Sequence, residues 1–432
     1  MANKAKKIPH IKPINNFAML FVLSIFQLIT GFEAASAHND FSTKAMLANI
    51  VLIALEWVYV SLLYIIVHRR NFELEFIAFF LSGVGLTVIG SVNPKACFKQ
   101  LIILAVSVVA YTVFTFVLGD VDLCMKLRLP VAIAGLILLA VNLVFGTEKY
   151  GARNWIGIGS FTLQPSEFVK VAFIFVGAAT LEKIQTSKNI IRFIIFSVAC
   201  VGALILMRDF GAALIFFITF LIIAFMNSGD IKTAGLAVAA AGLGGAIVIK
   251  YKPYVTARFS IYRHIWEDTY GKGYQQTHIL TGIASGGLLG LGIGNGNIRK
   301  FFDDYLVYTD DVFGVICEEW GYIFAVVLVL SFVAIAVSAL VNSIAARSTF
   351  YSIAAVAGAG MLLFQCALNI FGITDVLPLT GVTLPFVSQG GTSLMSCWLV
   401  LAFIKASDVR TYSYLGAVSY THLRAHETEA DL

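Results

Sequence analysis

The stretch IIRFIIFSVACVGALILMRDFGAALIFFITFLIIAFM, residues 190–226, decides the class of fold. Its two apolar runs, 190–207 and 210–226, are separated only by Arg208 and Asp209. An α-helix needs about 20 predominantly apolar residues to cross the hydrocarbon core of a bilayer. Each run is close to that length. The stretch therefore predicts two transmembrane helices joined by a sharp polar reversal at the membrane edge.

The same pattern recurs along the whole chain. Hydrophobic residues make up 59% of the sequence and charged residues 13%, and the mean hydropathy is +0.86. Soluble domains carry about 25% charged residues, so this chain has too little charge to cover a water-facing surface. About twelve apolar spans are predicted, at 17–36, 46–67, 74–92, 98–119, 128–146, 166–182, 190–207, 210–226, 232–250, 312–341, 350–373 and 386–405. We expect an all-α polytopic membrane protein with a large extracytoplasmic loop.

Charge and cysteine usage narrow the function. The net charge is +5, and the basic residues lie in short loops instead of on one face, so a nucleic-acid partner has no support. The six cysteines are scattered, without a Cys-x-x-Cys pair or a Cys/His cluster, and are interpreted as small hydrophobic residues instead of metal ligands. Residues 417–432 look unlike the rest of the chain. They are open to interpretation as a read-through artefact and are left out of the fold prediction.

The loops between the predicted spans differ in charge. One alternate set carries most of the Lys and Arg residues, such as Arg69 and Arg70. The positive-inside rule places this set, and with it both termini, in the cytoplasm. The long segment 251–311 is then extracytoplasmic.

Polar residues gather in a few stretches on the predicted outer face. The first is GARNWIGIGSFTLQPSEFVK, residues 151–170. Pro165 suits the first turn of a helix, and Glu167 and Lys170 then share one face of that helix. An ionisable pair at the mouth of a membrane helix predicts a functional site. A purely structural ion pair that locks the helix bundle explains the pattern equally well. At the reversal near 208 we favour a structural role, because Asp209 can cap the helix that follows.

Three further stretches lie toward the C-terminus. The glycine-rich GYQQTHILTGIASGGLLGLGIGNG, 273–296, permits close backbone approach to a ligand, with a surface-lying hairpin as the alternative. In YTDDVFGVICEEWG, 308–321, Asp310 and Asp311 lie where the loop meets the next helix. A carboxylate there is either a general base or a helix cap, and taken alone the stretch favours the cap. In LPLTGVTLPFVSQGGTSL, 377–394, prolines and glycines break the helical pattern, as membrane segments that line a cavity do.

Together these stretches resemble the SEDS family, whose members include RodA, FtsW and SpoVE. GARNWI and QPSEFVK are similar to the family patterns GA-x-RWI and QPSE-x-x-K, and GYQ and ASGGLLGLGI are similar to GYQ and GSGGL-x-G-x-GL. TDDVF…EEWG and PFVSQGGTS are similar to TD-x-x-F…EE-x-G and PF-S-GG-S. Five motifs in the family's order make the match specific. The resemblance favours a catalytic role for Asp310 over a capping role.

The resemblance also implies an organisation. Residues 74–410 resemble the ten-helix family core, with both ends in the cytoplasm. Residues 1–73 add a basic N-terminus and two extra transmembrane helices, and 411–432 form a cytoplasmic tail. Four positions depart from the family pattern. This chain has Arg208 where the family has Pro, Tyr308 where it has His, Asp311 where it has Phe, and His278 where it has Gln.

Members of the family are inverting transferases that join lipid II units. The resemblance therefore implies a peptidoglycan glycosyltransferase of the bacterial cytoplasmic membrane, with its active site on the extracytoplasmic face. Asp310 would take the proton of the acceptor 4-hydroxyl, and Arg153 and Lys170 would stabilise the developing pyrophosphate charge. The residues expected to bind substrate are Arg153, Trp155, Glu167, Lys170, Asp209, Tyr274, Gln275, Ser285, Gly286, Gly287, Asp311, Glu319, Ser388, Gly390 and Gly391. No cofactor or metal ligand is implied, and assistance by a divalent cation stays open.

The implied partners are lipid II, a class B penicillin-binding transpeptidase and other elongation or division machinery. The branch of wall synthesis (elongation, division or sporulation) is not decided by the sequence. A lipid II flippase is the main alternative, and a non-catalytic scaffold is the second. A flippase needs polar residues through the depth of the membrane, whereas the motif residues cluster at one face, which favours the enzyme. A scaffold would leave the Asp310 motif free to vary without loss of growth.

Overall fold

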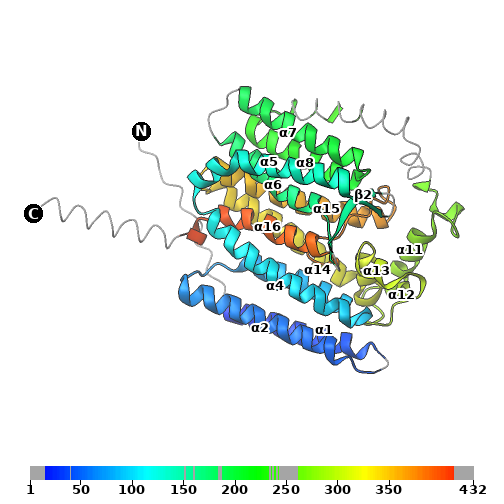
Figure 1. Cartoon of the computed structure of the whole chain (residues 1–432). Helices are drawn as coiled ribbons and strands as arrows, with labels where there is room; N and C mark the ends of the chain where they lie inside the picture. The colour runs from blue at the N-terminus through cyan, green and yellow to red at the C-terminus, as the bar shows by residue number, and fades with distance from the viewer. Residues whose placement is uncertain are drawn as a thin grey trace, which may run out of the picture.

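The computed structural model describes residues 15–38, 40–149, 152–158, 161–182, 187–232 and 261–412, and the isolated positions 235, 238, 239 and 242. Its longer helices are α1 (Asn16–Ser36), α2 (Thr43–Ile66), α3 (Glu73–Val92), α4 (Pro94–Val117), α5 (Val121–Phe145), α6 (Pro165–Leu181), α7 (Ser187–Leu206), α8 (Phe210–Ser228), α11 (Tyr274–Gly286), α14 (Val312–Ile344), α15 (Thr349–Ile373) and α16 (Gly391–Ser407). Short helices are η1 (Ile265–Glu267), α12 (Ile298–Phe301), α13 (Asp304–Tyr308) and η2 (Val409–Tyr412). Most of the long helices run side by side in one bundle (Figure 1).

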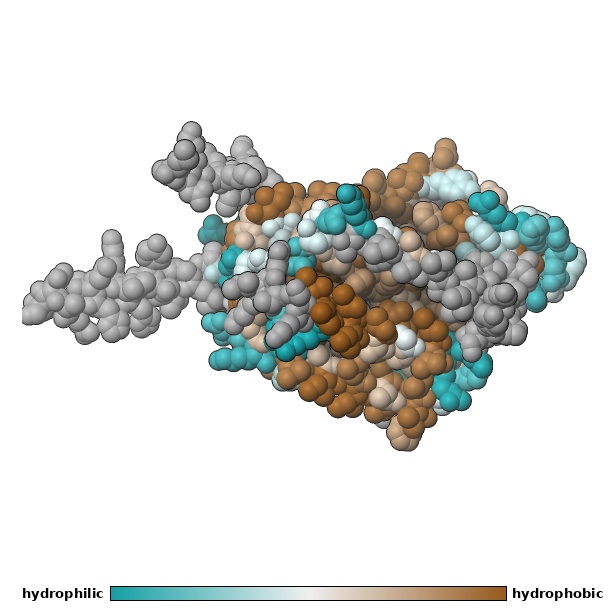
Figure 2. Space-filling model, turned by 90° about the horizontal axis from the view of Figure 1, so that it is seen from above, coloured by the Kyte–Doolittle hydropathy of each residue, from teal (hydrophilic) through white to brown (hydrophobic). Residues whose placement is uncertain are grey.

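The predicted polytopic membrane fold is confirmed. Within the described residues, nine helices are long and apolar enough to cross a membrane. The shorter α6 and α16 coincide with two more predicted spans, and the remaining one, 232–250, lies almost wholly outside the described residues. Figure 2 shows apolar side chains over the middle of the molecule and hydrophilic ones gathered toward its ends. A bilayer covers such a belt.

The helix α3 forms the centre of the bundle. In the most apolar part of α3, 83% of the residues are buried. In the corresponding part of α5, which lies on the outside, 17% are buried. Gly85 lets α3 approach the connection between α15 and α16, because a Cβ there would clash with the Val387 carbonyl. The backbone of α3 therefore packs directly against that connection.

One end of the bundle holds both ends of the described chain. At the start of α1, Nδ2 of Asn16 donates to the Arg70 carbonyl at 2.9 Å. Nδ2 of Asn71, in the same connection, donates to Oδ2 of Asp408 at 2.7 Å, just beyond α16. The α2–α3 connection thus joins the first helix to the last one, at the left of Figure 1.

A buried ion-pair cluster lies beside this junction. Glu75 of α3 pairs with Nζ of Lys405 at 3.2 Å and with the Arg69 guanidinium, and it accepts from the Tyr111 hydroxyl at 2.5 Å. Several partners for one buried carboxylate offset the cost of removing it from water.

The opposite end of the bundle, called the β2 end below, carries three short strands that the all-α expectation did not include. β1 (Thr147–Lys149), β2 (Ala152–Ile158) and β3 (Phe161–Leu163) pair antiparallel in the order β1-β2-β3. The backbone N–H of Arg153 donates to the Met207 carbonyl at 2.9 Å, which fixes the sheet to the α7–α8 reversal. The segment from η1 to α13 lies at the same end (Figure 1).

The helix α14 is broken at Gly321, whose φ is +82°. The glycine-rich loop after α11 satisfies backbone groups at this break. The N–H of Leu291 donates to the Glu318 carbonyl at 3.0 Å, and the N–H of Tyr322 donates to the Gly287 carbonyl at 3.0 Å. The long predicted span is therefore a short buried helix followed by a membrane-crossing one.

Candidate functional site

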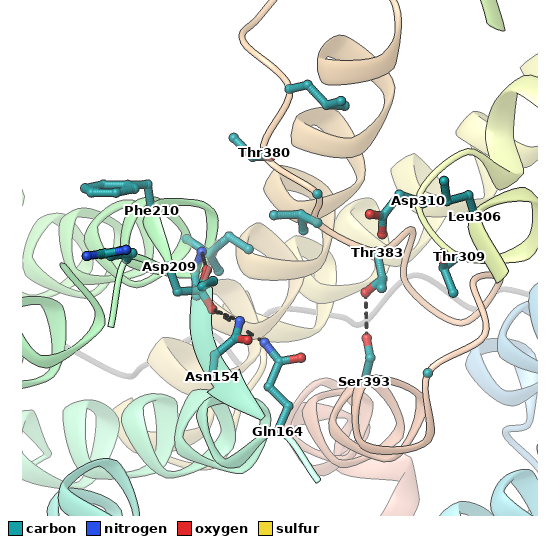
Figure 3. A pocket seen from close by; sticks show the side chains of 18 of the residues that line it. Asn154, Gln164, Asp209, Phe210, Leu306, Thr309, Asp310, Thr380, Thr383 and Ser393 are labelled. Carbon is teal, nitrogen blue, oxygen red and sulfur yellow. Dashed lines mark hydrogen bonds between the residues drawn. The ribbon is translucent and has the colours of Figure 1, made fainter. Parts of the chain in front are cut away.

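A cavity of about 480 Å³ opens at the β2 end. It lies between β2, the start of α6, the α7–α8 reversal, α11, α13 and the α15–α16 connection. Seven residues predicted for the site line it: Trp155, Glu167, Lys170, Asp209, Gln275, Asp310 and Gly390. In Figure 3, Asp310 and Thr309 face the cavity from one side, and Asp209 and Asn154 from the other. Residues from distant motifs thus share one site.

The two adjacent aspartates have different surroundings. Asp310 is half-buried, and no described residue donates a hydrogen bond to its carboxylate; only its backbone carbonyl is bonded, by Nδ2 of Asn369 at 2.9 Å. Asp311 is fully buried and accepts from Nε2 of Gln275 at 2.8 Å. Burial raises the pKa of Asp310 to about 6. Burial also raises the pKa of Asp311 to about 7, against the hydrogen bond from Gln275. Asp310 is the aspartate open to a ligand.

The predicted ion pair of α6 is formed and lies at the cavity wall. Nζ of Lys170 is 2.8 Å from Oε1 of Glu167 and 2.9 Å from Oε1 of Gln365. The hydroxyl of Ser396 donates to the other oxygen of Glu167 at 2.6 Å. The pair joins α6, α15 and α16, so it has a structural role whatever else it does. Two of the three ammonium donors are used, which leaves one for a ligand.

The far wall is organised by Asp209. Its Oδ1 accepts from the Ala212 N–H at 3.0 Å, which confirms the predicted helix cap. Its Oδ2 accepts from Nδ2 of Asn154 at 2.8 Å and lies 3.5 Å from Nε2 of Gln164 (Figure 3). The carboxylate therefore holds β2 and the start of α6 against α8.

The α15–α16 connection forms the floor. The Thr383 and Ser393 hydroxyls are 2.8 Å apart (Figure 3). Ser388 is buried beneath the surface, where its hydroxyl donates to the Thr309 carbonyl at 2.6 Å and accepts from the Leu384 N–H. Ser388 thus positions the residue before Asp310 and does not reach the cavity.

Other predicted residues also lie away from the cavity. Arg153 is exposed, the Tyr274 ring packs against the His278 ring in a tilted arrangement, and Gly391 packs on Ile103. Glu319 is buried and holds the glycine-rich loop through the N–H groups of Gly294 and Gly296. Ser285, Gly286 and Gly287 form the C-terminal end of α11 and do not line the cavity, and Gly286 lies against the Cys317 carbonyl.

Several cavity residues were not predicted. Lys272, Asp375 and Thr380 line the cavity from loops, and Tyr305 lines it from α13. Lys272 precedes the GYQ motif directly, so its position beside a motif was the only available signal. Tyr305 and Asp375 lie just before the stretches 308–321 and 377–394, and Thr380 lies inside the second, without a pattern of their own.

The arrangement is suited to acid–base chemistry on a polar ligand. It combines an unpaired, half-buried carboxylate at Asp310 with cations lining the same cavity, Lys170, Arg208 and Lys272. A base of raised pKa and nearby positive charge can remove a proton from a hydroxyl and stabilise an anionic leaving group. Among the described residues, no three His, Cys, Asp or Glu side chains are grouped to hold a metal ion.

Comparison with known proteins agrees with this geometry. The FtsW/RodA/SpoVE family model, described as "Cell cycle protein", matches residues 62–412. The chain is 31% identical over 283 residues to the "Probable peptidoglycan glycosyltransferase FtsW" of Wigglesworthia glossinidia brevipalpis, covering 63% of this chain and 74% of that protein. It is 32% identical over 259 residues to "Stage V sporulation protein E" of Bacillus subtilis, covering 58% and 69%.

Two solved structures share the fold. One belongs to a study of "polymerization and crosslinking by a peptidoglycan synthase complex", with a TM-score of 0.65, 26% identity, and coverage of 79% of this chain and 97% of that one. The other is the "Rod shape determining protein RodA" of Thermus thermophilus, with a TM-score of 0.60, 24% identity, and coverage of 80% and 97%. The likeness extends over most of the bundle.

Proposed function

Because the chain belongs to the FtsW/RodA/SpoVE family of cell cycle proteins, we propose that it is a peptidoglycan glycosyltransferase that polymerises lipid II in the bacterial cytoplasmic membrane. The observation that carries the proposal is the Asp310 carboxylate. It is half-buried, lines the cavity, and receives no hydrogen bond from any described residue.

Asp310 acts as the general base. The 4-hydroxyl oxygen of the acceptor sugar attacks C1 of the donor sugar, and the bond from C1 to the pyrophosphate oxygen breaks. The proton of the hydroxyl passes to Asp310, and undecaprenyl pyrophosphate leaves with the electron pair. A carboxylate of raised pKa is better matched to this transfer near neutral pH than an ordinary aspartate.

The leaving pyrophosphate is anionic, and three cations line the cavity: Lys170, Arg208 and Lys272. We assign the pyrophosphate to this group. Arg153, expected in that role, is exposed on β2 outside the cavity lining. Ala212 and Ile215 of α8 continue the lining as apolar surface, which suits the isoprenoid tail.

The sidedness of the site is part of the proposal. The charge bias of the loops puts the β2 end outside and both termini in the cytoplasm. A class B penicillin-binding transpeptidase is the proposed partner, in keeping with the related synthase complex that polymerises and crosslinks. We expect no cofactor, with the effect of a divalent cation settled by comparing rates with and without a chelator.

The direct test is polymerisation of purified lipid II by the purified protein, alone and with the transpeptidase. Glycan strands should form with the wild type and not with Asp310→Asn. Lipid II transport across vesicles without any polymer, unaffected by Asp310→Asn, would replace the transferase with a flippase.

A further inference from the structure

A second cavity, of about 440 Å³, lies behind α11. That helix separates the two cavities. Gln275 and Gln276 face the cavity of Asp310, whereas Thr277, Thr281 and Ser285 face the second one. The two spaces therefore lie on different faces of the same helix.

Aromatic rings form the outer wall of the second cavity. Trp266, Tyr270 and Phe301 line it and are 61%, 94% and 46% exposed. Rings exposed to this extent contribute little to the core of the protein. Their faces suit the apolar face of a pyranose ring, which packs against aromatic side chains.

The polar groups of this cavity are mostly neutral. Nδ1 of His278 donates to the Tyr274 carbonyl at 2.8 Å, which leaves Nε2 as an acceptor for a ligand hydroxyl, since no described residue bonds it. Thr281 and Ser285 are exposed on the same side of α11; each hydroxyl donates to a carbonyl of its own helix and keeps its oxygen as an acceptor for a ligand. Such a surface offers several hydrogen bonds to a polyhydroxyl ligand.

The two cavities differ in the charge of the residues that line them. Among the described residues, no Lys or Arg lines the second cavity, and its one carboxylate, Glu318, is occupied. Oε1 of Glu318 accepts from the Asn297 N–H at 2.8 Å, and Oε2 accepts from the Ile298 N–H at 3.0 Å. A pyrophosphate has no counter-charge here, in contrast to the cavity of Asp310. The second cavity suits the sugar portion of the polymer and not its lipid carrier.

We propose that this cavity is a saccharide subsite that holds sugar units of the glycan strand beyond the point of bond formation. The proposal rests on the proposed function, because the strand held here must be made in the first cavity. Retention of the strand there keeps successive additions on the same strand.

The test measures binding and strand length separately. Full-length protein in nanodiscs is titrated with chitotetraose, a neutral oligomer of N-acetylglucosamine, by calorimetry. Trp266→Ala and Tyr270→Ala should each weaken binding roughly five-fold, the loss expected for one aromatic contact. The matched control is Phe145→Ala, because Phe145 is 69% exposed at the end of α5 beside β1 and lines neither cavity. It should bind as the wild type does, and inorganic pyrophosphate should not compete.

In polymerisation assays the two variants should make shorter strands while the initial rate of lipid II consumption stays near that of the wild type. Equal binding by all variants, or strands of unchanged length, would overturn the subsite. Loss of transpeptidase binding with unchanged saccharide binding would also overturn it and assign the rings to a protein interface. A wild type that binds chitotetraose but makes no polymer would instead refute the proposed function.

Discussion

Nε2 of Gln275 lies 2.8 Å from Oδ1 of Asp311 and donates a hydrogen bond to it. This contact engages one of two neighbouring carboxylates and leaves the other, Asp310, open to the cavity. The helix α11 thus distinguishes two adjacent acids and leaves open the one, Asp310, that the family resemblance predicts to be the general base. The distinction gives the proposed mechanism its first test.

Asp310→Asn should lower polymerisation by about 10²–10⁴-fold, the usual contribution of a general base. Asn preserves the size of the side chain but cannot take the proton. Asp311→Asn should be milder, because Asp311 is bonded to Gln275 and buried. Initial rates of the two purified variants decide between the neighbours, with protein abundance and lipid II binding as controls. Activity retained by Asp310→Asn and lost by Asp311→Asn would transfer the role to Asp311.

The rate of polymerisation should depend on pH through Asp310. Burial raises its pKa to about 6, and a base works only when it is deprotonated. Activity should therefore be present above pH 6 and fall as the pH drops through about 6, whereas an ordinary aspartate would hold activity down to about pH 4. Initial rates between pH 5 and 8 measure this. In Asp311→Asn the inflection should remain above the value of an ordinary aspartate, because burial raises the pKa of Asp310. A flat profile would contradict the assignment.

The buried pair of Glu167 and Lys170 has a structural role and a proposed role in activity, and substitutions can separate the two. Glu167→Gln or Lys170→Met alone should lower stability by about 3–5 kcal/mol, because each leaves a buried charge without its partner. The double variant should recover most of that stability. We expect it to remain poorly active, since the ammonium that faces the cavity is gone. Thermal unfolding and polymerisation of the three variants are compared, and full activity in the double variant would make the pair purely structural.

Cysteine labelling tests the orientation. All six native cysteines are buried, so an impermeant maleimide should give little background in intact cells. Lys272→Cys at the β2 end should be labelled from outside, and Ala345→Cys at the opposite end of α14 only after the cells are opened. The reverse labelling pattern would show that the orientation in the membrane is inverted, with the proposed site on the cytoplasmic face.

The glycine-rich loop supplies a matched pair of substitutions. Gly287 and Gly290 both have positive φ, +58° and +80°, but only Gly290 lacks room for a Cβ, which would clash with the Glu319 carbonyl. Gly287→Ala should therefore cost about 1–3 kcal/mol of backbone strain, and Gly290→Ala clearly more. The thermal midpoint of each purified variant is the measurement. Equal losses would mean that the contact with α14 is unimportant.

Much of the fold follows from hydropathy. The apolar runs of the sequence coincide with the long helices, and the polar break at Arg208 and Asp209 is the α7–α8 reversal. The helix cap at Asp209 and the pairing of Glu167 with Lys170 were also predictable, because both depend on residues close in sequence. Local spacing fixes such contacts without knowledge of the fold.

Contacts between distant motifs were not predictable. The bond from Asn154 to Asp209 and that from Gln275 to Asp311 depend on which helices are neighbours, which hydropathy does not specify. The three strands were missed because segments of three to seven residues leave little periodicity beside long apolar runs. Glu319, expected near substrate, instead holds a loop, since a motif shows that a residue matters but not which neighbour it touches.

The tie between α3 and α16 has a consequence for biogenesis. Lys405 and Glu75 are 330 residues apart, and ribosomes add about 5–20 residues per second. For roughly 15–70 s of synthesis, Glu75 is therefore in the membrane without its final partner. Assembly of the core is completed only when the last helix leaves the translocon. Chains truncated before α16 keep this acid incompletely paired within the membrane.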